Sequence, residues 1–86
     1  MAKYIDPRSL GLPSRTTVEE IDSNTLAIVI TRKSRIIMAD GLKILAKVAT
    51  IKTTRPGIRV VLKTATPICS KTLQFFETER LEVIQN

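Results

Sequence analysis

The fold is decided by one stretch of sequence, TLAIVITRKSRIIMADGLKILAKVATIKT (Thr25–Thr53), along which the spacing of apolar residues changes. Within the first seven residues, the five from Leu26 to Ile30 are apolar at consecutive positions, which is typical of a strand buried on both faces. After Ser34 the apolar residues recur every three or four positions, which is the period of a helix with one buried side. The stretch therefore predicts an interior strand followed by a long amphipathic helix.

The helix is expected to begin at Ser34, a favoured N-cap residue, and to end near Thr53, because Arg55-Pro56-Gly57 follows. Its apolar face comprises two neighbouring rows: Ile37, Gly41, Ile44, Val48 and Ile51 beside Met38, Leu42, Leu45 and Ala49. The opposite stripe, predicted to face solvent, carries Asp40, Lys43, Lys47, Thr50 and Thr54. The alternative is a hairpin that turns at Asp40-Gly41, but the frequent Ala and Lys residues favour the helix.

The sequence on either side predicts three more strands and a second helix. Upstream, the run from Arg15 to Asp22 is joined to the interior strand by Ser23-Asn24, which indicates a hairpin, and its acidic residues suit a sheet edge. Downstream, residues 58–65 alternate as a strand with one core face. Ser70 is expected to cap a second helix that turns Leu73 and Phe76 inward, and residues 81–84 form the last strand.

These elements give the order ββαβαβ in a chain of 86 residues, enough for one hydrophobic core. We expect a single α+β (α/β-like) domain over residues 15–86, with residues 1–14 as an extended N-terminal arm. Right-handed crossovers would place both helices on one face of a mixed four-stranded sheet. The open face would then carry Val29, Val61 and Ile84 together with Arg59, Lys63 and Glu82.

The composition excludes several classes of function. The chain has no His, and its only cysteine is Cys69, so neither a zinc cluster nor a nucleophile paired with His can form within one chain. We therefore expect a non-enzymatic protein with no cofactor and no metal site. The longest clean apolar run, Leu26 to Ile30, is too short to span a bilayer, and no signal peptide is recognisable, so we expect no membrane association and a cytoplasmic location.

The net charge of +6 is unevenly placed along the chain. Between Arg32 and Lys71 there are ten basic residues and one acidic residue, Asp40, whereas the remainder holds four bases and seven acids. A basic middle of this kind favours an anionic partner such as DNA or RNA. The candidate anion-binding residues share positive charge or a helix-start position: Arg32, Lys33, Arg35, Arg59, Lys63, Ser70 and Lys71.

The segment from Lys63 to Thr72 resembles a P-loop, in which a strand leads through a glycine-rich turn into a helix that holds a phosphate. Lys71 and Thr72 match that motif, but Ala65 and Ser70 replace its two glycines and Pro67 removes an amide donor. We therefore do not expect nucleotide hydrolysis, although the start of this helix is still a candidate for binding an anion. Cys69 in the same segment lacks a second cysteine and a histidine, so a thiol reaction is not expected.

The run Val60-Val-Leu-Lys63, followed by a helix and a strand, also looks like the later part of a PD-(D/E)XK nuclease domain. Val61 stands at the position of the family's glutamate, so the resemblance implies that the metal site has been lost.

The function predicted from the sequence is binding of nucleic acid through its phosphate backbone, by a surface that includes Arg59 and Lys63 but not Lys43 and Lys47. The sheet face lacks aromatic residues, which argues against base stacking. The alternative is a homodimer or an accessory subunit that binds a protein partner through the open, partly apolar sheet face.

Overall fold

The computed structural model describes residues 3–85 and confirms the change from strand to helix in the deciding stretch. Strand β3 (Thr25–Ile30) is followed by helix α1 (Met38–Thr54), which continues through Asp40-Gly41, so the hairpin alternative is wrong. The other elements are β1 (Lys3–Ile5), the short 3₁₀ helix η1 (Pro7–Leu10), β2 (Thr17–Asp22), β4 (Arg59–Thr64), α2 (Ser70–Thr78) and β5 (Glu82–Gln85).

The strands form one mixed sheet of five, in the order β1-β2-β3-β4-β5. The first three strands are antiparallel to one another, whereas β4 runs parallel to both β3 and β5. The predicted count of four strands is wrong because Lys3–Ile5 adds a strand beside β2. For the same reason β2 is an interior strand and not the edge that its acidic residues indicated.

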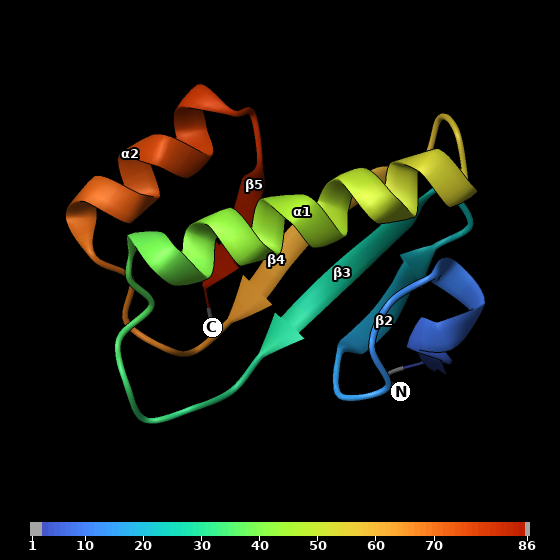
Figure 1. The fold of residues 1–86 in the computed structure, drawn as a ribbon, viewed down its shortest axis with the longest axis horizontal. Helices are drawn as coiled ribbons and strands as arrows, with labels where there is room; N and C mark the ends of the chain where they lie inside the picture. Colours follow the sequence, from blue (N-terminus) through green and yellow to red (C-terminus); the bar gives the residue numbers. More distant parts are fainter. Residues whose placement is uncertain (1–2, 86) are drawn as a thin grey trace.

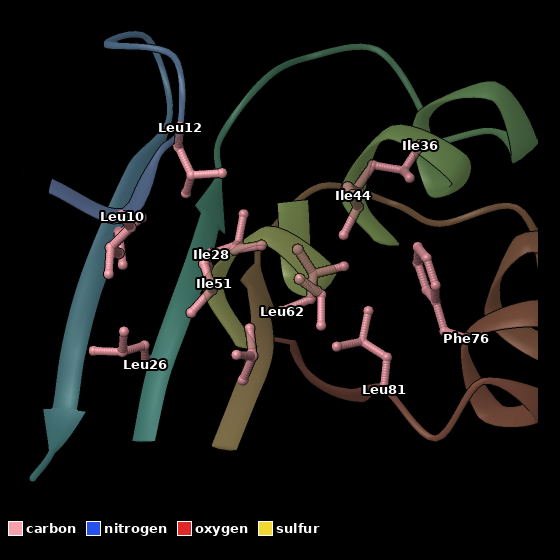
Figure 2. Packing of buried hydrophobic residues seen from close by; sticks show 13 residues of the cluster. Leu10, Leu12, Leu26, Ile28, Ile36, Ile44, Ile51, Leu62, Phe76 and Leu81 are labelled. Atoms are coloured by element: carbon pink, nitrogen blue, oxygen red, sulfur yellow. The ribbon is translucent and has the colours of Figure 1, made fainter. Parts of the chain in front are cut away.

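Both helices cover the same face of this sheet, and Figure 1 shows α1 lying across β3 and β4. Ile44 and Ile51 of α1 and Phe76 of α2 share one core cluster with Leu62 of β4. The fully buried side chains in Figure 2 come from both helices, the central strands and the N-terminal segment. The protein is thus a small α+β domain with two helices, and no helix within residues 3–85 is long and apolar enough to cross a membrane.

Helix α1 begins four residues later than Ser34, which does not cap it. Ile37 is the N-cap residue, and the carboxylate of Asp40 accepts a hydrogen bond from its backbone N–H at 3.0 Å. The chain bends at Lys33 and Ser34. Ile36 then pairs with Ile68 as an isolated parallel bridge, so the backbone is extended up to the N-cap residue Ile37. Ser70 is likewise not a cap but the first residue of α2, whose N-cap is Cys69.

Gly41 lies where α2 crosses α1. A Cβ atom at this position would lie 3.1 Å from Cγ2 of Thr72 and 3.3 Å from Cε1 of Phe76. Glycine inside a helix costs about 1 kcal/mol relative to alanine. The close approach of the two helices explains why glycine is nevertheless found here.

The N-terminal segment, expected to be an extended arm, contains β1 and η1 and contributes to the core. Leu10 and Leu12 are 1% and 5% exposed (Figure 2), and the hydroxyl of Thr54 donates to the backbone carbonyl of Leu10 at 3.1 Å. The polar stripe of α1 therefore does not face solvent along its whole length, because its last turns contact this segment.

Candidate functional site

Five of the seven residues predicted to bind an anion lie together at the edge of the sheet where β3 and β4 end. The chain after β3 (residues 31–37) runs beside the chain after β4 (residues 65–69), since the backbone N–H of Ile36 donates to the carbonyl of Pro67 and the backbone N–H of Cys69 donates to the carbonyl of Ile36, both at 2.9 Å. The five residues in or beside these loops are Arg32, Lys33, Arg35, Ser70 and Lys71.

Arg32 has a structural role within this edge. Its guanidinium donates to both carboxylate oxygens of Asp40 and to the backbone carbonyls of Ser34 and Arg35. Its backbone N–H and C=O both bond to the hydroxyl of Thr66, at 3.1 and 3.0 Å. The hydrogen bonds from Arg32, and next the one from the Ile37 amide, lower the pKa of Asp40, and the same ion pair raises the pKa of Arg32. Arg32 thus joins the first loop to the start of α1.

Arg59 and Lys63 lie on the opposite, helix-free face of the sheet, and each has an acidic partner. Nζ of Lys63 is 2.9 and 3.2 Å from the two carboxylate oxygens of Glu19, whose side chain is only 9% exposed. The guanidinium of Arg59 is paired with Glu82, and both of these side chains are half exposed or more. Neither base is free to bind a phosphate without first leaving its partner.

The open face also lacks the predicted apolar patch. Val61 is 1% exposed and Ala27 is fully buried although no helix covers them, so the side chains of the two ion pairs and their neighbours shield them. Val29 is half-buried, and of the three predicted residues only Ile84 is exposed. The largest group of exposed apolar side chains lies instead at the start of α1, at Ile37, Met38 and Leu42.

Three further bases lie at the same edge as Arg32: Arg15, which the sequence analysis did not consider, and Lys43 and Lys47, which it expected to lie outside the binding surface. Arg15 comes just before β2, and β2 is antiparallel to β3, so Arg15 lies beside the end of β3. Arg15, Arg32 and Lys47 line one surface hollow, and Lys43 is close enough to Asp40 to help lower its pKa. The position of Arg15 beside the end of β3 could have been predicted from the hairpin of β2 and β3. The positions of Lys43 and Lys47 could not, because they depend on how α1 packs on the sheet.

We call the combined surface the basic edge, defined as Arg15, Arg32, Lys33, Arg35, Lys43, Lys47 and Lys71. Within the described part of the chain, five ion pairs are present, and only Arg32 of these seven bases takes part in one. Asp40 is the acidic residue held among them. Of the nine bases without an ion pair in the described structure, six therefore lie at this edge, and the other three are Lys52, Arg55 and Arg80.

Cys69 lies at the start of α2, next to the basic edge. Backbone N–H groups of Lys71 and Thr72 lower the pKa of its thiol, with smaller contributions from the Thr72 hydroxyl and Arg35. No second cysteine exists in the sequence, and across residues 3–85 no three His, Cys, Asp or Glu side chains gather as a metal site would require.

Comparison with protein families, with curated proteins and with solved structures found no significant match to this chain.

Proposed function

We propose that this protein binds duplex nucleic acid through its phosphate backbone, with little dependence on base sequence. The observation that carries the proposal is the basic edge, where six of seven bases have no acidic partner in the described structure. Phosphates attract such side chains, and the release of counterions from the duplex drives the association.

The shape and composition of the edge support this mode of binding. Lys33, Arg35, Lys43 and Lys71 are exposed side chains in short loops or in the first two turns of a helix, so they can reach a phosphate without disturbing the core. Tyr4 is 63% exposed but lies on β1, Phe76 is buried and Phe75 packs against the core cluster, so the edge offers no exposed aromatic side chain for base stacking. Contacts to the backbone remain the mode that this surface supports.

Fluorescence anisotropy with a labelled duplex at several salt concentrations tests the proposal. We expect log K to fall linearly with log[salt], and the double variant Arg35→Ala/Lys71→Ala to reduce that slope by about two. The matched control is Lys52→Ala/Arg55→Ala, which removes two exposed, unpaired bases from the far end of α1. Equal losses from both double variants would show that net charge alone drives binding, and would contradict a role for the basic edge.

A second candidate function is supported by the exposed apolar side chains at the start of α1. Ile37, Met38 and Leu42 are 51%, 40% and 58% exposed, and such a group is a usual feature of a protein interface. The protein would then act as a subunit of an assembly. The variant Leu42→Ser distinguishes a subunit of an assembly from a monomeric nucleic-acid-binding protein. Self-association through this patch, measured by sedimentation equilibrium, must weaken in the variant. Duplex binding by a monomer, measured by fluorescence anisotropy, must not.

A further inference from the structure

A hollow on the helix side of the sheet lies between the start of β2, the end of β3 and the middle of α1. Its volume is about 230 Å³. Its lining combines charged, hydroxyl and apolar groups, contributed by Arg15, Thr16, Thr17, Ile28, Val29, Ile30, Thr31, Arg32 and Lys47. Nothing described above assigns a ligand to this hollow.

The charges around the hollow are all of one sign. Arg15, Arg32 and Lys47 line it, no carboxylate does, and only Arg32 is paired with an acid elsewhere. Lys47 is only partly exposed. An anion in the hollow would be attracted by the charges of Arg15 and Lys47, neither of which has an acidic partner among residues 3–85.

Thr16 gives a second and independent indication of a ligand. The residue is 7% exposed, and its hydroxyl oxygen is buried without a hydrogen-bond partner, although its backbone N–H bonds to the carbonyl of Pro13. A buried hydroxyl without a partner calls for an explanation, and a bound group supplies one at Thr16, which lines the hollow, whereas the similarly unpartnered hydroxyl of Thr72 does not line it. A small movement of this hydroxyl would add it to the Arg15 guanidinium and the Lys47 ammonium as a hydrogen-bond donor.

The size of the hollow restricts the anion. Pockets for drug-sized molecules occupy about 300–1,000 Å³, and the hollow is smaller than that range. It would hold roughly seven water molecules, which leaves room for one tetrahedral oxyanion but not for a whole nucleotide. The guanidinium of Arg15, which has no acidic partner in the described part of the chain, favours an oxyanion that can accept paired hydrogen bonds, whereas the guanidinium of Arg32 is already bonded to Asp40 and to two backbone carbonyls.

We infer that this hollow binds a phosphate group carrying two negative charges, either inorganic phosphate or the terminal phosphate of a nucleic acid strand. The inference goes beyond the proposed function, because phosphate binding at Arg15, Thr16 and Lys47 can be measured with no duplex present. If the ligand is a nucleic acid strand, its terminal phosphate would occupy the hollow and its internal phosphates would contact the bases of the basic edge that lie outside the hollow.

Titration of the ¹⁵N-labelled protein with sodium phosphate, against sodium chloride at matched ionic strength, tests the inference. We expect saturable shifts of the Thr16, Thr31 and Lys47 amide signals at millimolar phosphate and none with chloride. Lys47→Gln should weaken the affinity about tenfold, whereas Lys52→Gln, on the same helix but outside the hollow, should leave it unchanged. Shifts that follow ionic strength alone, or equal losses from both lysine variants, would overturn the inference.

Thr16→Val separates a binding role from a structural one. Because the hydroxyl has no partner in the folded protein, this variant should keep or raise the melting temperature while it weakens phosphate binding about fivefold. Unchanged phosphate affinity in a folded Thr16→Val protein would overturn the role of the hydroxyl and with it the site.

The source of the phosphate is distinguished with two oligonucleotides of one sequence, one bearing a 5′-phosphate and one a 5′-hydroxyl. Tighter binding of the phosphorylated strand, lost in Thr16→Val, identifies a nucleic acid terminus as the ligand. Equal binding of both strands, with the phosphate titration unchanged, identifies a free phosphate instead. Failure to bind any duplex contradicts the proposed function but leaves the phosphate titration as an independent result.

Discussion

The open face of the sheet and the basic edge both carry positively charged residues, but they differ in what surrounds those residues. On the open face, Lys63 and Arg59 are paired with Glu19 and Glu82, acids supplied by other strands of the sheet. At the basic edge, six bases have only Asp40 nearby, and Arg32 already occupies it. The number of basic residues in a segment is therefore a poor guide to a binding surface until the ion pairs formed in the fold have been subtracted.

On this contrast we propose the opposite of the ranking that the sequence predicted for the two pairs of bases. Arg59 and Lys63 were expected to bind and Lys43 and Lys47 to be solvated, because an even spacing places the first pair on one face of a strand. That geometry is correct, since both lie on the open face. Their acidic partners are distant in the sequence: Glu82 is 23 positions from Arg59, and Glu19 is 44 positions from Lys63. A local sequence pattern cannot predict such pairs.

The largest effect is expected at the segment that carries Arg15 to the basic edge. Leu10 is 1% exposed in the core, so Leu10→Ala should reduce the free energy of unfolding by about 2–4 kcal/mol. Urea denaturation measures this change. A loss below about 0.5 kcal/mol would mean that the N-terminal segment is not held against α1. Arg15 would then not be fixed at the basic edge, and this surface would not differ from the open face in the way described.

The next effect concerns Lys63, whose removal leaves the carboxylate of Glu19 largely buried and without its partner. Lys63→Ala should destabilise the protein by about 1–3 kcal/mol, as measured by chemical denaturation. The double variant Glu19→Gln/Lys63→Ala should regain part of that loss, because it no longer buries an unpaired charge. If Lys63→Ala instead left stability unchanged and weakened duplex binding, the open face would be the functional one.

A smaller effect is expected at Asp40, and it depends on pH. Its pKa in the folded protein lies below the ordinary 3.8, so its ionised form favours folding. That contribution is complete above roughly pH 5 and is lost as the pH falls through the folded-state pKa. Asp40→Asn should lower the melting temperature by a few degrees at neutral pH, with the difference closing in acid. A difference that persisted at low pH would mean that the ion pair with Arg32 is not its cause.

The smallest effect is expected at Arg59. The ion pair with Glu82 is exposed, so Arg59→Ala should change stability by no more than about 0.5 kcal/mol. It should also leave the slope of log K against log[salt] unchanged for a duplex, because this base lies away from the basic edge. A decrease of about one in that slope would show that Arg59 contacts a phosphate of the duplex and belongs to the binding surface.

Much of the architecture could be predicted from local patterns. The period of two in β4 and of about 3.6 in α1, the Ser23-Asn24 turn and Pro56 together predicted the central elements and their order. The starts of both helices were misplaced, because Ser34 and Ser70 are good caps in isolation. In the fold Ile36 pairs with Ile68, so the helix begins only after the N-cap residue Ile37, whose backbone N–H donates to the carboxylate of Asp40. Strand β1 was missed because three residues give no period, and its pairing partner lies about fifteen residues away.

The sequence by itself determined the class of fold, the absence of His and of a second cysteine, and the excess of positive charge in the middle of the chain. Those properties depend on residue type and on neighbours within a few positions. Only the tertiary structure decided which bases are neutralised, because Lys63 meets Glu19 across β3 and Arg59 meets Glu82 across the β4–β5 pair. It also decided that Arg15, Arg32 and Lys47 surround one hollow, since the antiparallel start of β2 and the middle of α1 converge there only after the sheet has formed.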